Sequence, residues 1–294
     1  MLKKYPNHLD AWVSLLSSVE IPILATTHEK ITEQQKNIGN LDLRDIAILI
    51  RHDPLLSLKL LKHQENKRSL QQTADVTTIE KILLMIGITG FFRTFGGSPH
   101  LENMLQKNEV ALHACHQTCA RAFFASQLAE AMGKYRRDID PNEIVTAALL
   151  HETAEILLWQ AAPELMLEIK SAMRSDSTLR SKDIQKQILG CTVNELQQQL
   201  SKLWHLPKIL VHLADEDFSD EPRVKIVQLA TGIARHSEWA WNTEYNQQDL
   251  IKCADFLKIS LEEAHQIIVT TAVYTAKHWR WYGVQPSIAR LVEY

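Results

Sequence analysis

Apolar residues recur along most of this chain at steps of three and four residues, which is the spacing of one face of an α-helix. The alternation of apolar and polar residues that marks a half-buried strand is scarce. Glycine and proline number only nine each, and residues that begin or end helices recur along the chain. The pattern therefore predicts an all-α fold of about a dozen helices.

Helix-capping residues indicate where the first helices begin. We expect a short amphipathic helix over residues 8–19 and a polar helix around residues 26–37. Asp42 is placed to cap the next helix, because a carboxylate at this position accepts hydrogen bonds from the unpaired N–H groups of the first turn. Asp53 and Pro54 then end that helix and start another, since proline loses no hydrogen bond at a first helical position.

Two further signals interrupt the N-terminal part of the chain. Residues 64–76 are polar and lack a helical stripe, which predicts a loop, and Gly87 is placed to end the helix that follows. The Gly-Gly-Ser-Pro turn that ends at Pro99 is the best candidate for a boundary. We therefore expect three parts, an N-terminal helical subdomain over residues 1–100, a second helical subdomain over residues 101–236 and a C-terminal helical extension over residues 237–294.

The second half of the chain shows the same punctuation. We expect a long helical region over residues 101–132, then a helix over residues 140–159 that Asp140 caps and Pro141 begins. Two capping boxes, in which a cap residue and the third helical residue bond to each other's backbone, predict later helices. They are formed by Thr192 with Glu195 and by Ser260 with Glu263.

Composition excludes some classes of partner. The 294 residues suffice to bury a core without disulfides or a structural metal. Charged residues make up 23% of the chain and the formal net charge is −3, so the basic excess of a dedicated nucleic-acid-binding protein is missing. We therefore expect no nucleic-acid partner.

The sequence also bears on the compartment. No apolar run approaches the roughly 20 residues that span a membrane, and the N-terminus lacks the apolar stretch of a signal peptide. The four cysteines, Cys115, Cys119, Cys191 and Cys253, suit reduced thiols better than a disulfide framework. We therefore expect a cytoplasmic protein with no membrane partner.

The helix over residues 140–159 carries the most suggestive chemistry, a His-Glu pair amid apolar neighbours. His151 lies on the same helical stripe as Ala147, so we expect its side chain to point inward. Glu152 is turned about 100° from His151, and the two can share a ligand only at the edge of this face. Such residues form either a ligand pocket or, more commonly, an internal polar cluster in which His151 contacts Glu155.

A second group of metal-ligand types lies at helical spacing just upstream. It consists of His113, Cys115, His116 and Cys119. One helix rarely closes a tetrahedral zinc site, and the paired CxxC or HExxH spacing of strong zinc motifs is absent. We therefore assign no metal to this group.

In order and spacing, these motifs resemble the HDOD domain, a non-enzymatic relative of the HD metal-dependent phosphohydrolases found in bacterial signalling proteins. The resemblance covers roughly residues 16–236. It rests on IPILATTHEKI, DLRDIAILIRHDPLLSLKLLK and TTIEKILLMIGITGFFRTF in the first half, and on AALLHETAEILL and ILGCTVNELQQQLSKLWHLPKILVHLAD in the second. It implies a multi-helical HDOD/HD-like bundle, and residues 101–236 would be the HD-like subdomain.

The resemblance also implies where a metal site would lie. An active HD phosphohydrolase is expected to use a histidine, a His-Asp pair and a later aspartate, which match His116, His151-Glu152 and Thr231. Glutamate is one methylene longer than aspartate and Thr231 is neutral, so ligand geometry and ligand count both disfavour a metal. We therefore expect a degenerate site with His116, His151 and Glu152 as vestigial metal-site residues, and we assign no catalytic residue, bound metal or cofactor.

The implied function is a non-catalytic regulatory module that binds a protein partner in bacterial signal transduction, and a homo-oligomer is compatible with this role. One alternative is a residual metal-dependent phosphohydrolase acting on a nucleotide or cyclic dinucleotide. A second alternative is binding of a nucleotide or small anion without turnover, with helix N-termini as donors.

The region after residue 236 is rich in aromatic residues. Such residues either anchor a binding partner or supply core, and we favour packing of this extension against the HD-like part. They are Trp239, Trp241, Tyr245, Tyr274, Trp279, Trp281 and Tyr282.

Overall fold

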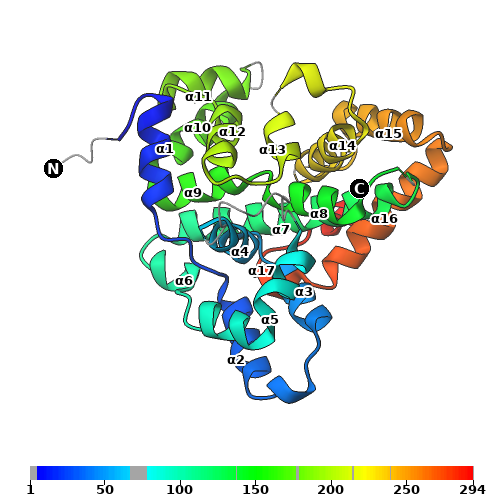
Figure 1. Ribbon diagram of the computed structural model, residues 1–294. Coiled ribbons are helices and arrows are strands. Elements are labelled where there is room, and N and C mark those ends of the chain that lie inside the picture. The colour runs from blue at the N-terminus through cyan, green and yellow to red at the C-terminus, as the bar shows by residue number, and fades with distance from the viewer. Residues whose placement is uncertain are drawn as a thin grey trace.

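The computed structural model describes residues 5–66, 78–136, 138–176, 179–213, 215–238 and 240–293. Throughout these ranges the regular elements are helices, with one isolated bridge between Ile23 and His100 (Figure 1). The predicted all-α fold is confirmed. Within the same ranges, none of the helices combines the length and the apolar character needed to cross a lipid bilayer.

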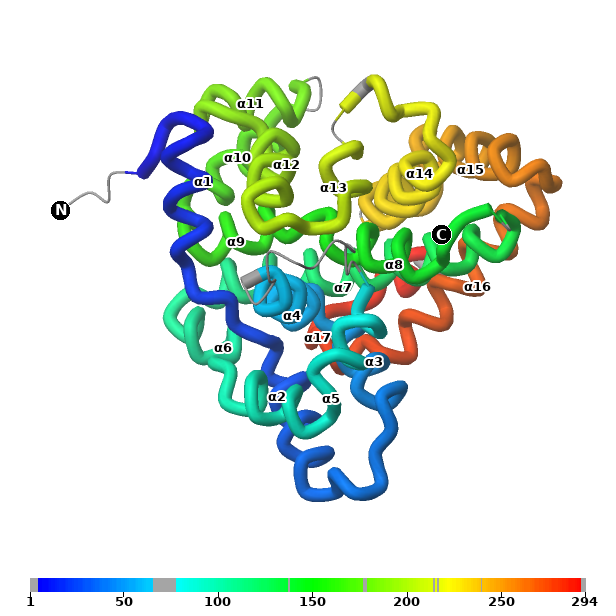
Figure 2. Tube along the Cα trace, in the orientation of Figure 1, coloured from blue at the N-terminus to red at the C-terminus, as the bar shows by residue number. Residues whose placement is uncertain are grey.

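The longest described helix, α7 (Glu109–Gly133), lies at the centre of the molecule (Figure 2). Small buried residues such as Ala114, Ala122 and Ala129 line it, so neighbouring helices can approach closely. The helices packed around it include α8 (Pro141–Leu150), α9 (Thr153–Ala161), α14 (Pro222–Ser237) and α16 (Leu261–Ala276).

The region over residues 101–132 is not one continuous helix. A short helix, α6 (Leu101–Met104), comes first, and the chain leaves the helical path before α7 begins. The Asn108 side chain accepts a hydrogen bond from the N–H of Ala111 and so caps α7. The sequence signal for this cap lies inside the segment that we predicted as helix.

The N-terminal helices begin where their caps predict. Asp42 caps α3 (Leu43–Arg51) in a capping box, and Asp53 accepts hydrogen bonds from the N–H groups of the first turn of α4 (Pro54–Asn66). The buried Asp53 carboxylate also accepts a 2.8 Å hydrogen bond from the N–H of Leu24, just before α2 (Ala25–Gln35). One side chain therefore ties together the starts of two helices.

The structure tests two predictions for this region, a loop over residues 64–76 and a helix end at Gly87. Residues 64–66 belong to α4, and most of the predicted loop, residues 67–76, lies outside the described residues. Gly87 adopts a φ of 65° and interrupts the helical backbone where we expected a helix end. The chain then resumes a helical path, so that α5 spans Ile79–Phe95 across this kink.

The first helix, α1 (Leu9–Ser18), packs against α9 and α12 (Val193–Leu203), far along the chain. The indole N–H of Trp12 donates a 2.9 Å hydrogen bond to the carbonyl of Leu189. Close by, Gly190 has a φ of 75°, and a Cβ there would lie 1.8 Å from the carbonyl oxygen of Asn7. Only glycine fits this contact between the chain start and the end of α11 (Ser181–Leu189).

The C-terminal helices α15 (Glu244–Leu257) and α16 pack on α14 and α7, respectively, and α17 (Trp279–Tyr282) reaches α2. Trp281 donates to the hydroxyl of Thr27 at 3.0 Å, and the Tyr282 hydroxyl donates to the carbonyl of His52 at 2.7 Å. The extension therefore contacts the N-terminal part as well as the HD-like part.

The aromatic residues of the extension divide into two groups. Trp241, Trp281 and Tyr282 pack against the core, whereas Tyr245, Tyr274 and Trp279 are exposed, and Trp239 lies outside the described residues. Buried apolar residues of all three predicted parts belong to one continuous core. The division of the chain into these parts stays a prediction.

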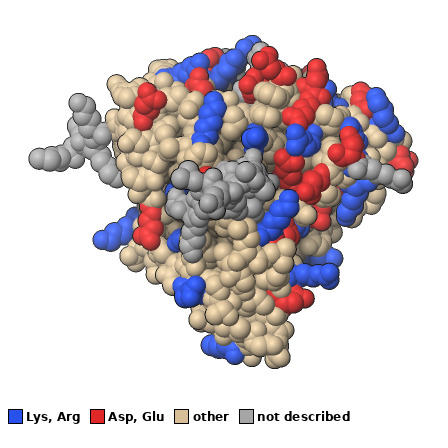
Figure 3. Space-filling model, in the orientation of Figure 1, with Lys and Arg blue, Asp and Glu red and all other residues tan. Residues whose placement is uncertain are grey.

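Charge is mixed on the surface shown in Figure 3. Lysine and arginine alternate with aspartate and glutamate over the upper part of this face, and the lower part carries few charges. The face therefore presents no extended field of one sign, in keeping with a formal net charge of −3.

Candidate functional site

The helix predicted over residues 140–159 breaks at the His-Glu pair. α8 ends at Leu150, and α9 begins at Thr153, because the backbone of Glu152 leaves the helical region. The prediction of one continuous helix was therefore wrong at this point. The break turns the Glu152 side chain toward α7.

A glutamine from another helix satisfies the backbone groups at this break. Gln197 of α12 accepts hydrogen bonds from the N–H of Ala154 at 2.8 Å and from the Thr153 hydroxyl at 3.1 Å. Its amide N–H donates to the carbonyl of Leu150 at 3.1 Å. Since buried backbone groups need partners, this one side chain compensates for the interrupted helix.

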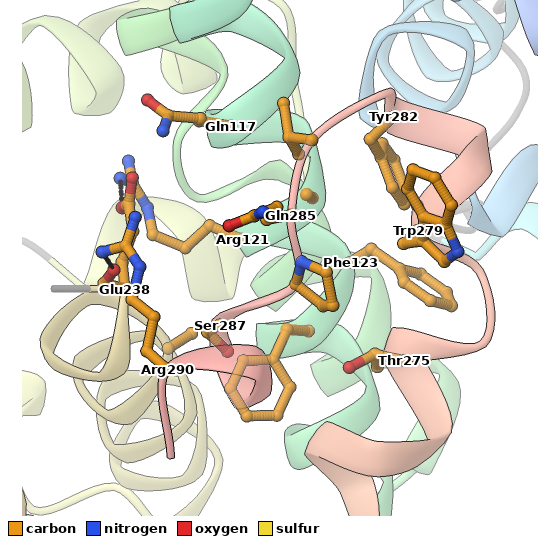
Figure 4. Close-up of a pocket in the computed structure, with 15 residues that line it drawn as sticks. Gln117, Arg121, Phe123, Glu238, Thr275, Trp279, Tyr282, Gln285, Ser287 and Arg290 are labelled. Carbon is orange, nitrogen blue, oxygen red and sulfur yellow. Dashed lines mark hydrogen bonds and ion pairs between the residues drawn. The ribbon is translucent and has the colours of Figure 1, made fainter. Parts of the chain in front are cut away.

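The break between α8 and α9 places Glu152 against Arg121 of α7. The Arg121 side chain bonds to three carboxylates. Arg121 donates from Nε to Glu152 at 2.6 Å, from Nη2 to Glu155 at 2.9 Å and from Nη1 to Glu238. Arg235 of α14 donates to the other oxygen of Glu152 at 3.0 Å. We call these five residues the Arg121 cluster, and Figure 4 shows its Arg121–Glu238 pair.

Arg121 and Glu152, the two most buried residues of the Arg121 cluster, are both ionised at neutral pH. Only 10% of the Arg121 side chain and 5% of the Glu152 side chain are exposed. Burial opposes ionisation of Glu152, but the charges of Arg121 and Arg235 outweigh it and lower the pKa of Glu152 to about 2. Burial likewise opposes the charge of Arg121, and the three glutamates raise its pKa well above the usual value.

Lys170 of α10 (Pro163–Ser175) completes the charge balance. Burial lowers the pKa of Lys170, and the charges of Glu238 and Glu155 partly oppose this shift. With Lys170, the Arg121 cluster has three positive and three negative charges. Paired charges of this kind avoid the large cost of an uncompensated buried ion.

His151 lies next to the Arg121 cluster as a neutral group. Burial, reinforced by the charge of Arg235, lowers the pKa of His151 to about 4. Its buried Nδ1 has no hydrogen-bond partner among the described residues. Glu155 bonds to Arg121 and to the Thr118 hydroxyl rather than making the one-turn contact that we expected with His151.

His116 belongs to a different cluster. Its Nε2 lies 2.9 Å from Glu102 of α6, and the other oxygen of Glu102 accepts a hydrogen bond from the N–H of Ala25. His116 and Arg121 are five residues apart on α7, which turns their side chains about 140° from each other. His116 therefore supports the start of α2, and the structure does not pair it with Glu152.

Thr231, the residue matched to the later aspartate of an HD phosphohydrolase, also lies outside the Arg121 cluster. The Thr231 hydroxyl donates to the carbonyl of Val227, one turn earlier on α14. Arg235, one turn later, is the residue of α14 that reaches Glu152. Helix α14 therefore contributes the basic group of Arg235 to Glu152, although it is the helix on which an HD phosphohydrolase would carry its later aspartate.

These residues do not fit a divalent metal. Arg121 and Arg235 each hold one oxygen of Glu152, so a metal would have to displace two guanidinium groups that also repel it. The orphaned Nδ1 of His151 is a single ligand. In the part of the chain that the structure describes, no group of three or more histidine, cysteine or acidic residues is arranged to hold a metal ion.

Sequence reasoning named Glu152 and Glu155 but missed Arg121, Arg235 and Glu238. A usable signal existed for Arg121, because it is the lone charged residue in the run CHQTCARAFFASQLA. A charge within an apolar helix predicts a buried partner. The identity of that partner depends on chain segments that lie 31 and 117 residues away.

Comparison with known families decides the relationship that the motifs suggested. The model of the HDOD domain family matches residues 21–217. The chain belongs to the HDOD family. Of the Arg121 cluster in this HDOD protein, Arg121, Glu152 and Glu155 lie within the matched range, whereas Arg235 and Glu238 follow it.

Solved structures share the HDOD fold. The MmoQ response regulator from Methylococcus capsulatus is 15% identical, with a TM-score of 0.63 over 85% of this chain and 98% of that one. A virulence factor from Campylobacter jejuni is also 15% identical, with a TM-score of 0.59 over 92% of this chain and 99% of that one. At this identity the likeness shows the fold alone. No curated protein matches the chain.

Proposed function

We propose that this HDOD protein is a non-catalytic regulatory module that acts by binding a protein partner in bacterial signal transduction. The observation that carries the proposal is the pairing of both Glu152 oxygens with guanidinium groups of Arg121 and Arg235. A fixed guanidinium compensates the carboxylate charge, but it cannot lower the pKa of a bound water as a metal does. Arginine also does not exchange protons near neutral pH.

Two further observations support this setting. One relative in fold, the MmoQ protein, is described as a response regulator, which is a signalling protein. All four cysteines are buried free thiols, as suits the reducing cytoplasm in which we place the protein. The alternative, a residual phosphohydrolase, would need a metal at the Arg121 cluster.

The experiment that separates these functions is metal analysis of untagged protein purified without chelator from cells supplied with manganese, iron and zinc. We expect well under one metal ion per chain and no hydrolysis of bis(p-nitrophenyl) phosphate above a buffer control. The reason is that no carboxylate oxygen of Glu152 is open to a cation.

A matched pair of variants makes the result interpretable. His151→Ala removes the one orphaned imidazole of the site, and His265→Ala removes an exposed histidine of α16. About one metal ion per chain in the wild type and in His265→Ala, lost in His151→Ala together with hydrolysis, would overturn the non-catalytic proposal.

A further inference from the structure

A cleft of about 790 Å³ opens beside the Arg121 cluster, bordered by α7, α9, α10, α11, α12 and α14. The Arg121, Glu155 and Glu238 side chains form part of its lining. The proposed regulatory function makes no use of this space. Its volume is that of a site for a small organic molecule.

Helix α10 gives the cleft an apolar wall. Met166 and Ile169 are almost fully buried within the protein, and Met173 follows one turn later with part of its side chain exposed. Methionine is unbranched and polarisable, so it adapts to apolar ligands of different shape. The wall therefore suits the hydrocarbon part of a ligand.

Basic residues predominate among the charged groups of the cleft. Among the lining residues that the structure describes, five are basic and two are acidic, and both of these glutamates bond to Arg121. Arg235 is paired with Glu152, and Lys170 balances the Arg121 cluster, so the excess positive charge of the lining comes from Arg174 and Lys182 and favours an anion. The basic residues are Arg121, Lys170, Arg174, Lys182 and Arg235.

We propose that this cleft binds a small amphipathic anion, with its carboxylate or phosphate among the basic side chains and its hydrocarbon part against α10. The inference goes beyond the proposed function and does not rest on it, because a chain with or without a metal can use this cleft. Bound there, the ligand would contact α10, α11 and α14 together and would so stabilise their arrangement.

Calorimetric titration with a small set of probes tests the ligand class. Decanoate and decyl phosphate, below their micelle concentrations, carry both a hydrocarbon part and an anion. Acetate and inorganic phosphate have the anion alone, and decyltrimethylammonium has the hydrocarbon part with the opposite charge. We expect decanoate or decyl phosphate to bind one per chain and at least tenfold more tightly than the other three probes, and the tighter of the two identifies the anionic group.

Variants of the full chain place the binding in the cleft. Met173→Trp fills the apolar part, and Lys182→Glu reverses an exposed charge at the rim without disturbing the core. We expect each to weaken binding of the preferred probe about tenfold, whereas Lys252→Glu, the same reversal on the exposed side of α15, changes it less than twofold. Circular dichroism verifies that each variant is folded. If Met173→Trp does not fold, Lys182→Glu alone still tests whether the probe binds in the cleft.

Three results would overturn the inference. They are no binding of either amphipathic anion, equally tight binding of decyltrimethylammonium, and binding that neither cleft variant weakens. Direct binding of an acidic amphipathic peptide that the two cleft variants weaken, without any binding of decanoate or decyl phosphate, would assign the cleft to a protein segment instead. Metal content and hydrolysis are measured separately, so failure here leaves the test of the proposed function intact.

Discussion

Arg121 holds three carboxylates in a site that solvent barely reaches. Its planar guanidinium offers five N–H donors in a fixed fork, so a single side chain can bond to Glu152, Glu155 and Glu238 at once. A lysine could supply the charge but not this geometry. We therefore expect the Arg121 cluster to depend on arginine specifically.

Replacement of Arg121 by methionine should destabilise the protein by about 3–5 kcal/mol at pH 7, because it leaves buried glutamates without their counter-ion. The measurement is urea unfolding followed by circular dichroism. Without Arg121 the pKa of Glu152 rises, so protonation should partly restore the stability of the variant as the pH falls.

Arg235→Met is the matched control for this prediction. Arg235 pairs with the same carboxylate, but 48% of its side chain is exposed, so its loss should cost only about 1 kcal/mol. Equal losses in the two variants would contradict the assignment of Arg121 as the principal counter-ion.

His52 is a second buried ionisable residue, and it joins distant parts of the chain. Its ring stacks between Phe123 and Trp281, with centroid distances of 4.4 and 4.3 Å, and its Nε2 lies 3.3 Å from Nδ1 of His278. Burial lowers the pKa of His52 to about 4 from 6.5. The unfolded chain therefore binds this proton more tightly, and the stability from neutral His52 is present above pH 6.5 and is lost as the pH falls toward 4.

The phenylalanine variant of His52 measures this effect. We expect the free energy of unfolding of His52→Phe, relative to wild type, to improve by about 2 kcal/mol between pH 7 and pH 4.5. The difference is informative because the raised pKa of Asp53, about 6 owing to burial, shifts stability in the opposite direction over the same range. A difference that does not change with pH would show that His52 is not buried as a neutral group.

At the scale of the elements, the break between α8 and α9 determines where Glu152 points. The break persists because Gln197 supplies partners for Ala154, Thr153 and Leu150. The helix α12 that carries Gln197 is itself fixed by the capping box of Thr192 and Glu195, whose reciprocal backbone bonds are 3.1 and 2.7 Å long.

Gln197→Leu should therefore destabilise the protein by about 1–3 kcal/mol, because it leaves the buried N–H of Ala154 without its partner, whereas the carbonyl of Leu150 keeps the Thr153 hydroxyl. Thermal unfolding followed by circular dichroism gives the loss, and Gln187→Leu, an exposed position of α11, should stay within about 0.5 kcal/mol of wild type. If both variants unfold together with wild type, the amide of Gln197 does not support the break.

At the scale of the molecule, contacts between distant segments join the chain into one body. α1 packs on α9 and α12, while Trp281 and Tyr282 of α17 bond to residues of the N-terminal part. The C-terminal segment also covers one side of the Arg121 cluster, since Arg290 donates to the backbone carbonyl of Glu238 (Figure 4).

A continuous core of this kind predicts cooperative unfolding. We expect tryptophan fluorescence, which averages over seven tryptophans spread between Trp12 and Trp281, to share one urea midpoint with circular dichroism at 222 nm. Two separated transitions would show instead that the predicted parts are independent folding units.

The fold class and many helix boundaries of this protein could be predicted from the sequence alone, because they depend on interactions between residues that are close together in the chain. The all-α class and the helix starts at Asp42, Asp53, Thr192 and Ser260 follow from apolar periodicity and from caps that act within three residues. Glu152 could also be named as a candidate site residue, because it is an acidic group in a largely apolar segment of the sequence.

Only the tertiary structure decided which side chains surround Glu152 and which residues stay apart from it. The break at Glu152 depends on Gln197, the charge of Glu152 on Arg121 and Arg235, and the separation of His116 on its pairing with Glu102. These partners lie 14 to 83 residues apart along the chain. Periodicity and capping report on neighbours within about one helical turn, so they cannot specify which distant side chain satisfies a buried charge or an open backbone group.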